Sequence, residues 1–150
     1  MLTLPKRSFY DLANYHDAEC ISLYLPTHRA GMEVNRREDE ILFKNLLKNV
    51  AGQLEKRGYS PRETKDYLQP AYDLLERSTF WNHLSDGLVV FIANNNFKYY
   101  TLPIQFDTFI YMSDHFYLKP LMPLYNHDGR FFLLALSQDE IRFFEGTRHS

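Results

Sequence analysis

The stretch GLVVFIA, at residues 87–93, constrains the fold of this chain more than any other part of the sequence. Every position in it is apolar or glycine, so a strand formed by these residues presents apolar side chains to both faces of its sheet. Such a strand belongs in the middle of a sheet that is covered on both sides.

The rest of the chain supplies the elements that cover this strand. Most charged residues come before residue 80, in helical patterns, and most aromatic residues come after it, in strand-like runs. Charged helices followed by aromatic strands predict one α/β domain in which helices pack on a sheet. We expect a mixed β-sheet with two long helices packed on it, and 150 residues suit a single domain with a sizeable core.

Local signals place the two long helices. The first is expected to begin at Asn35, where the stretch NRRE matches a capping box, and to end before Gly58. Apolar residues recur along it at helical spacing, namely Phe43, Leu46, Leu47, Val50 and Leu54. The stretch SPRE, beginning at Ser60, predicts the second helix through a capping residue, a proline in the first turn and a glutamate that reaches back. Pro70 predicts a kink or break in that helix, since proline lacks an N–H.

Apolar alternation and turn residues predict the remaining elements. Strands are expected at 20–26, 87–93, 97–103 and 108–113, with a tight hairpin turn at 94–96. Residues 119–125 are expected to form a short helix or an extended loop, and strands at 130–137 and 140–146 a final hairpin. Phe80 and Trp81 are expected to anchor the end of the second helix to the sheet.

Charge and cysteine content narrow the setting of the protein. The chain has 17 basic and 19 acidic residues, a net charge of −2, whereas a protein that mainly grips nucleic acid usually carries a basic excess. This chain alone is therefore expected to hold RNA weakly. Its single cysteine, Cys20, excludes an internal disulfide and predicts a reducing compartment, which favours the cytoplasm. No apolar run is long enough to span a bilayer, so we expect no membrane contact, and the oligomeric state stays open.

One loop, at residues 26–31, carries the candidate binding residues. Thr27, His28 and Arg29 follow a predicted strand and precede a predicted helix. A hydroxyl, an imidazole and a guanidinium near a helix N-terminus suit an anion or a phosphate, and loops beyond the ends of strands are where α/β sheets bind ligands. The alternative is a polar turn in which Arg29 pairs with a nearby carboxylate.

The sequence contains no motif for a metal site or for an RNA-binding sheet. None of the six histidines is spaced from another as in a helical zinc site, and a lone cysteine excludes a cysteine-rich one, so we expect neither a metal nor a cofactor. The aromatic strands could stack bases, as in some RNA-binding sheets, but NFKYYTLP (96–103) lacks the basic and glycine residues of those motifs.

Five stretches in order resemble a known family: ISLYLPTHRAG, FKNLLKNV, FWNHLSDGLVVFIA, HFYLKPLMPL and RFFLLALSQDEIRFFEGT. Together they resemble the N-terminal part of the bacterial proteins related to archaeo-eukaryotic peptide-chain release factors, over residues 20–147. The resemblance implies an N-terminal α/β domain at 1–128 and, at 129–150, a hairpin that starts a truncated, ribonuclease-H-like middle domain. It implies a role in translation termination or ribosome rescue, through contact with the ribosome, RNA or a partner protein.

The catalytic feature of classical release factors does not carry over. Those proteins use a Gly-Gly-Gln loop, whereas no two glycines are adjacent here, and the nearest string, AGQ at 51–53, falls inside the first predicted helix. We therefore expect a non-catalytic module. One alternative is a binding domain or an enzyme that takes a small molecule, a nucleotide or another anion at the 26–31 loop. The other is an oligomerisation domain with aromatic residues of 97–117 at its interface.

Overall fold

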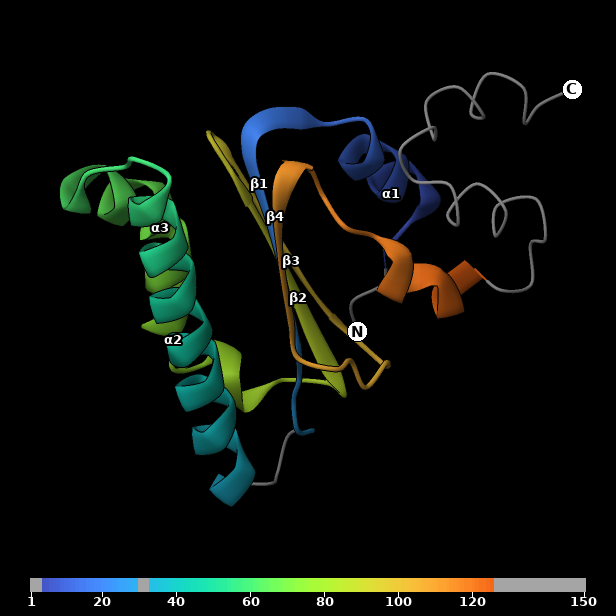
Figure 1. The fold of residues 1–150 in the computed structure, drawn as a ribbon. Helices are drawn as coiled ribbons and strands as arrows, with labels where there is room; N and C mark the ends of the chain where they lie inside the picture. Colours follow the sequence, from blue (N-terminus) through green and yellow to red (C-terminus); the bar gives the residue numbers. More distant parts are fainter. Residues whose placement is uncertain (1–3, 30–32, 126–150) are drawn as a thin grey trace, which may run out of the picture.

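The computed structural model describes residues 4–29 and 33–125, without the side chains of 33–36 (Figure 1). In chain order the elements are α1 (Lys6–Ala13), β1 (His16–Pro26), α2 (Glu33–Lys56), α3 (Pro61–Leu75), the 3₁₀ helix η1 (Phe80–Asn82), β2 (Gly87–Ala93), β3 (Asn96–Leu102), β4 (Phe109–His115) and the 3₁₀ helix η2 (Lys119–Tyr125). The predicted hairpin at 130–146 and the expected domain boundary after residue 128 lie outside the described residues.

The four strands form one sheet in the order β3-β2-β1-β4. The α/β class is confirmed, but all three strand pairs are antiparallel, where a mixed sheet was expected. The reason lies in the connection between β1 and β2, in which α2 leads the chain away and α3 brings it back (Figure 1). The chain therefore re-enters the sheet where it left, with Pro26 opposite Gly87, and β2 runs back along β1.

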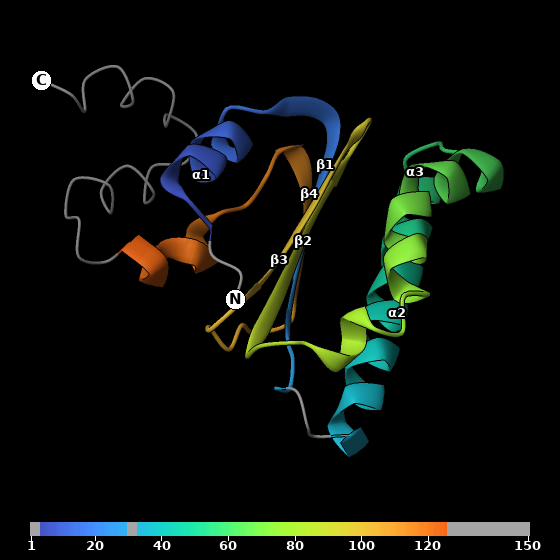
Figure 2. The ribbon, with the colours of Figure 1, turned by 180° about the vertical axis from the view of Figure 1, so that it is seen from behind.

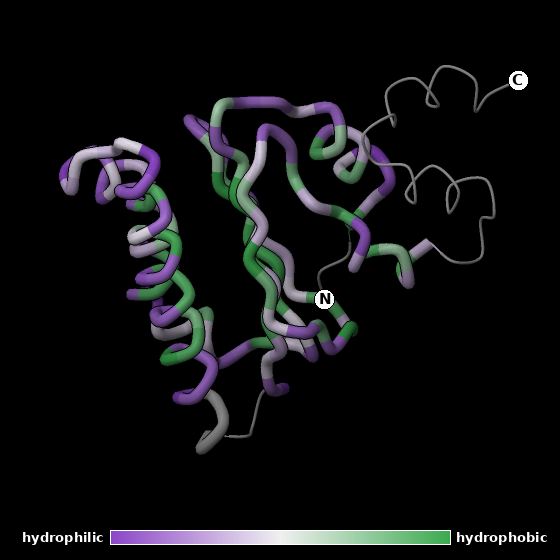
Figure 3. The backbone as a smooth tube through the Cα atoms, in the orientation of Figure 1, coloured by the Kyte–Doolittle hydropathy of each residue, from purple (hydrophilic) through white to green (hydrophobic). Residues whose placement is uncertain are grey.

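Two long helices cover one face of the sheet, as expected (Figures 1 and 2). Hydrophobic residues line the strands and alternate with hydrophilic ones along α2 (Figure 3). The core on this side joins helix residues such as Phe43 and Leu68 to strand residues such as Leu23 and Val90. β2 is buried along its whole length and lies between β1 and β3, so the prediction of a central strand is confirmed.

The predicted start of the second long helix, α3, is confirmed, whereas the predicted start of the first, α2, is not. Ser60 caps α3 in a full capping box with Glu63, as predicted. The first long helix begins at Glu33, so Asn35 lies inside its first turn and is not the cap. A kink or break was predicted at Pro70, and the break is wrong, because α3 continues through Pro70 to Leu75. Pro70 is exposed while the neighbouring Ala71 is fully buried, so packing on the sheet holds the helix together despite the missing hydrogen bond.

The opposite face of the sheet is covered by α1 and η2 (Figures 1 and 2). No sequence signal predicted α1, whose Phe9 and Leu12 are buried in the core on this side. Tyr24 and Phe91, from the two central strands, are fully buried in the same core. Both faces of the sheet are therefore packed over its centre, and among the residues that the structure describes no further strand covers the two outer strands, β3 and β4.

Candidate functional site

The candidate loop after β1 is held by the turn that precedes β2. The Thr27 hydroxyl donates to the carbonyl of Ser85 at 2.7 Å, and the Thr27 N–H donates to the carbonyl of Asp86 at 3.0 Å. Thr27 is buried. Its hydroxyl therefore joins the segment that leaves β1 to the segment that enters β2, at the same end of the two central strands.

His28 is tied to the second turn of α2 through Asp39. The His28 N–H donates to Asp39 Oδ2 at 2.9 Å, and His28 Nδ1 lies 2.8 Å from Asp39 Oδ1. Asp39 is only 2% exposed, and burial raises the pKa of its carboxyl, while the hydrogen bonds from His28 oppose that rise. Both carboxylate oxygens are thus engaged by one residue of the loop.

Arg29 forms a two-pronged contact with Asp86. Its Nε and Nη2 atoms donate to the two carboxylate oxygens, each at 2.9 Å. The alternative interpretation was a polar turn in which Arg29 pairs with a nearby carboxylate. The structure contains this pairing, and the carboxylate is that of Asp86. Anion binding by Thr27, His28 and Arg29 stays a prediction, and an anion there would compete with the carboxylates of Asp39 and Asp86.

A second candidate surface lies at β4, the outer strand next to β1. Three aromatic rings meet there, and we call Phe109, Tyr111 and Tyr117 the aromatic surface. The Tyr117 ring centroid lies 4.9 Å from that of Tyr111 and 5.1 Å from that of Phe109. Phe109 is 42% exposed, and among the described residues only Phe109 and Ile41 are large hydrophobic side chains with this much exposure.

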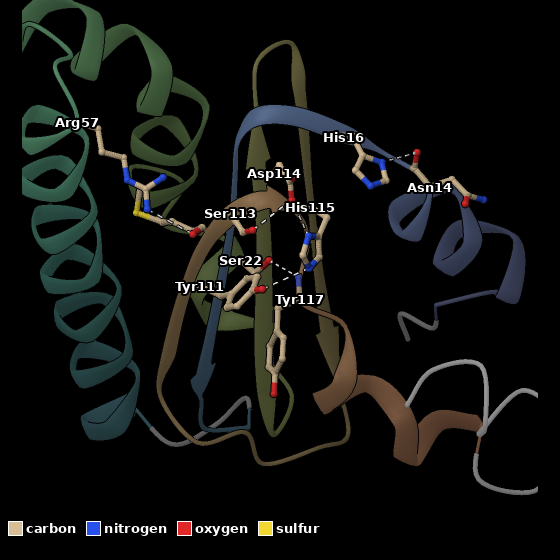
Figure 4. Close-up of polar contacts among 10 residues, drawn as sticks. Asn14, His16, Ser22, Arg57, Tyr111, Ser113, Asp114, His115 and Tyr117 are labelled. Carbon is tan, nitrogen blue, oxygen red and sulfur yellow. Dashed lines mark hydrogen bonds and ion pairs between the residues drawn. The ribbon is translucent and has the colours of Figure 1, made fainter. Parts of the chain in front are cut away.

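Buried side chains of β1 fix the aromatic surface from below. The Tyr117 N–H donates to Ser22 Oγ at 2.9 Å (Figure 4), and the Tyr24 hydroxyl donates to the Tyr117 carbonyl. Ser22 and Tyr24 are fully buried, and burial raises the pKa of Tyr24 well above its usual value, so its hydroxyl stays a donor. Two core residues therefore hold the backbone of one surface residue, which keeps its ring in place beside β4.

Polar side chains extend this surface toward the end of β4. His115 Nδ1 lies 2.8 Å from Asp114 Oδ1, and its Nε2 lies 3.3 Å from the Tyr111 hydroxyl (Figure 4). The hydrogen bond from His115 lowers the pKa of Asp114. A carboxylate, an imidazole and a hydroxyl are thus joined in sequence on a half-buried outer strand, and the contact with His115 orients the Tyr111 hydroxyl.

The surroundings of β4 are acidic. Residues 103–118 contain Asp107 and Asp114 and neither lysine nor arginine. Burial raises the pKa of the Cys20 thiol to about 12, and the nearby carboxylates of Asp17, Asp114 and Glu19 add to the rise. Arg57 pairs with Glu19, which leaves the other carboxylates to set the local charge.

In the described part of the chain, no three histidine, cysteine or acidic side chains gather in a way that would hold a metal ion.

Sequence reasoning found part of each site. It identified Thr27, His28 and Arg29 but missed Asp39 as the partner of His28 and Asp86 as the partner of Arg29. It noted the aromatic residues of 97–117 as a possible interface without separating Phe109 and Tyr111 from the core aromatics. Ser22, which holds the aromatic surface in place, carried no signal in the sequence.

The fold and these sites define an α/β domain with an antiparallel sheet, two long helices on one face and an accessible aromatic strand at one edge. No family model matches the chain, and no curated protein sequence matches it. Within the described residues, no helix is both long enough and apolar enough to cross a membrane. The release-factor resemblance therefore stays a prediction.

Proposed function

We propose that this chain is a non-catalytic binding module, the N-terminal module of a release-factor-like protein that acts in translation termination or ribosome rescue in the cytoplasm. The five ordered sequence stretches support the family. The aromatic surface on β4 is the observation that supports a binding role. On this proposal, residues 129–150 begin a following ribonuclease-H-like domain.

The aromatic surface has the features of a contact site. Phe109 is exposed, and Tyr111 and Tyr117 are half-buried. Accessible aromatic side chains that gather at one place are typical of protein interfaces, where they supply large contact areas with little loss of conformational freedom. Here the backbone of Tyr117 is already fixed by a hydrogen bond to Ser22 and by one from Tyr24. A partner that packs on this surface would therefore order few additional side chains, which favours affinity.

We propose protein contact in preference to RNA contact at this surface. Affinity for RNA rests largely on neutralising phosphates with lysine and arginine. Asp107 and Asp114 lie near the two ends of β4, and their carboxylates would repel a phosphate backbone. The proposed ribosomal contact is thus with a protein of the ribosome or with a factor bound to it. The 26–31 loop is not proposed as a second function, since carboxylates of the chain already engage His28 and Arg29.

Co-sedimentation with ribosomes tests this proposal. The full chain is expected to pellet with purified bacterial ribosomes through a sucrose cushion, and Phe109→Ser is expected to weaken binding about tenfold, since an exposed aromatic anchor contributes on the order of 1.4 kcal/mol or more. Ile41→Ser is the matched control, because Ile41 is 52% exposed on α2, away from the sheet. It should pellet like the unaltered chain.

Two results would contradict the proposal. If the unaltered chain stays in the supernatant, the ribosomal role is wrong. If all three forms pellet equally, the chain binds ribosomes through another surface, and the aromatic surface has no part in it. Circular dichroism of each variant establishes that the fold is retained.

A further inference from the structure

We propose that β4 binds an extended, basic segment of a partner protein as an added strand of the sheet. The inference rests on the proposed binding role and specifies its partner. In the proposed partner segment, basic side chains (arginine or lysine) alternate with apolar ones. The segment has about six residues, which is long enough to run along β4.

The backbone of β4 offers the first part of this site. β4 has seven residues, pairs with β1 on one side and has no strand on its other side among the described residues. In an antiparallel strand, alternate residues direct their N–H and C=O groups away from the partner strand, so an outer strand presents a row of groups ready to pair. One of these groups is already engaged: the Met112 carbonyl accepts a hydrogen bond from Arg57 Nη2 at 3.4 Å, which an added strand would have to displace.

The side chains of β4 and Tyr117 offer the second part. A strand added beside β4 would place alternate side chains next to Phe109 and Tyr111, on the face of the sheet where Tyr117 packs. Aromatic faces attract guanidinium and ammonium groups as well as apolar side chains. The aromatic surface therefore suits arginine at alternate positions of the incoming segment.

Charge decides which segment fits. Asp107 precedes β4 and Asp114 lies near its end, and both are exposed. They stand seven positions apart, roughly 23 Å if the chain were fully extended, so one carboxylate lies near each end of β4. A basic segment gains from both, whereas an acidic one is repelled.

The other outer strand serves as an internal comparison. β3 carries Lys98 on its exposed side, and Arg77 donates to the hydroxyl of Tyr99. The β3 edge is therefore basic and disfavours the same segment. Arg57 also reaches β4, but it pairs with Glu19, so β4 is the more acidic of the two edges and is the one that a basic segment favours.

Peptide binding tests the inference on the full chain. The probe is a fluorescein-labelled peptide of about nine residues in which valine and arginine alternate, with a valine–glutamate peptide of the same length as the control. The basic peptide is expected to bind, with weaker affinity at high salt, and the acidic peptide is expected not to bind. A valine–arginine peptide methylated at alternate backbone nitrogens, which cannot complete the strand ladder, is also expected not to bind.

Variants locate the peptide. Phe109→Ser is expected to weaken binding about tenfold. The double variant Asp107→Asn, Asp114→Asn is expected to weaken it roughly fivefold, since each pair is exposed and contributes modestly. Ile41→Ser and Asp66→Asn, an exposed carboxylate on α3, are the matched controls and should bind the peptide like the unaltered chain.

The outcomes separate this inference from the proposed function. No peptide binding, or binding that Phe109→Ser leaves unchanged, overturns the strand-addition inference even if ribosomes still pellet the chain. Binding of a labelled oligouridine that competes for β4 overturns it in favour of RNA. A concentration-dependent mass in light scattering that Phe109→Ser abolishes overturns it in favour of a second copy of the chain. Peptide binding at β4 without ribosome pelleting supports the inference and rejects the ribosomal role.

Discussion

Replacing Trp81 by alanine is expected to lower the free energy of unfolding by about 3 to 5 kcal/mol, the range found for large aromatic side chains removed from a core. Trp81 is 1% exposed, and its ring centroid lies 5.4 Å from that of Phe43 on α2. Its indole N–H also donates to the carbonyl of Leu74 at the end of α3, at 3.1 Å. One side chain thus ties both long helices to the entry of β2.

Urea unfolding measures this loss. Trp81 is the only tryptophan of the chain, so unfolding must be followed by circular dichroism and not by tryptophan fluorescence. Trp81→Phe keeps most of the apolar contact and loses the hydrogen bond, so its cost should be about 1 to 2 kcal/mol. Equal stability of Trp81→Ala and the unaltered chain would show that the helices do not depend on this contact.

Replacing Gly87 by alanine is expected to cost about 3 kcal/mol, at the upper end for overpacking, because the obstacle is backbone. A Cβ atom at Gly87 would lie 2.0 Å from the carbonyl oxygen of Ile104 and 2.6 Å from a ring carbon of Phe106. The Ile104 carbonyl cannot move without displacing the segment between β3 and β4. The β3–β4 connection therefore crosses so close to the first residue of β2 that only glycine fits.

Gly52 provides the control for this substitution. It lies inside α2, and a Cβ there meets nothing within 4 Å. Gly52→Ala is therefore expected to stabilise the protein by about 0.5 to 1 kcal/mol, since alanine favours a helix over glycine. The thermal unfolding temperatures of both variants measure these changes in stability. A Gly87→Ala protein as stable as the unaltered chain would contradict the close contact between Gly87 and the Ile104 carbonyl.

Much of the fold could be predicted from the sequence because its signals are local. The capping box at Ser60, the apolar run of β2 and the asparagine turn before β3 each act over a few residues, and Asn95 has the positive φ, 61°, that such a turn uses. α1 could not be predicted in this way, since eight residues without a side-chain cap form a helix only when packing holds them. The direction of β2 depended on the path of two helices, which no short pattern records.

The candidate sites were less predictable because their contacts join distant residues. Arg29 and Asp86 are 57 positions apart, and Ser22 and Tyr117 are 95 apart. The sequence identified the loop cations but not the carboxylates that engage them. It also identified the aromatic strands, but not the buried hydroxyls that fix Tyr117 beside β4.

Amide hydrogen exchange of the full chain, with and without bacterial ribosomes, tests most directly the claim that β4 is the binding surface. The account predicts slower exchange at residues 109–117 on ribosome binding, with unchanged exchange along β3. Protection confined to residues 26–29, or no change at β4 while the chain is bound, would contradict it.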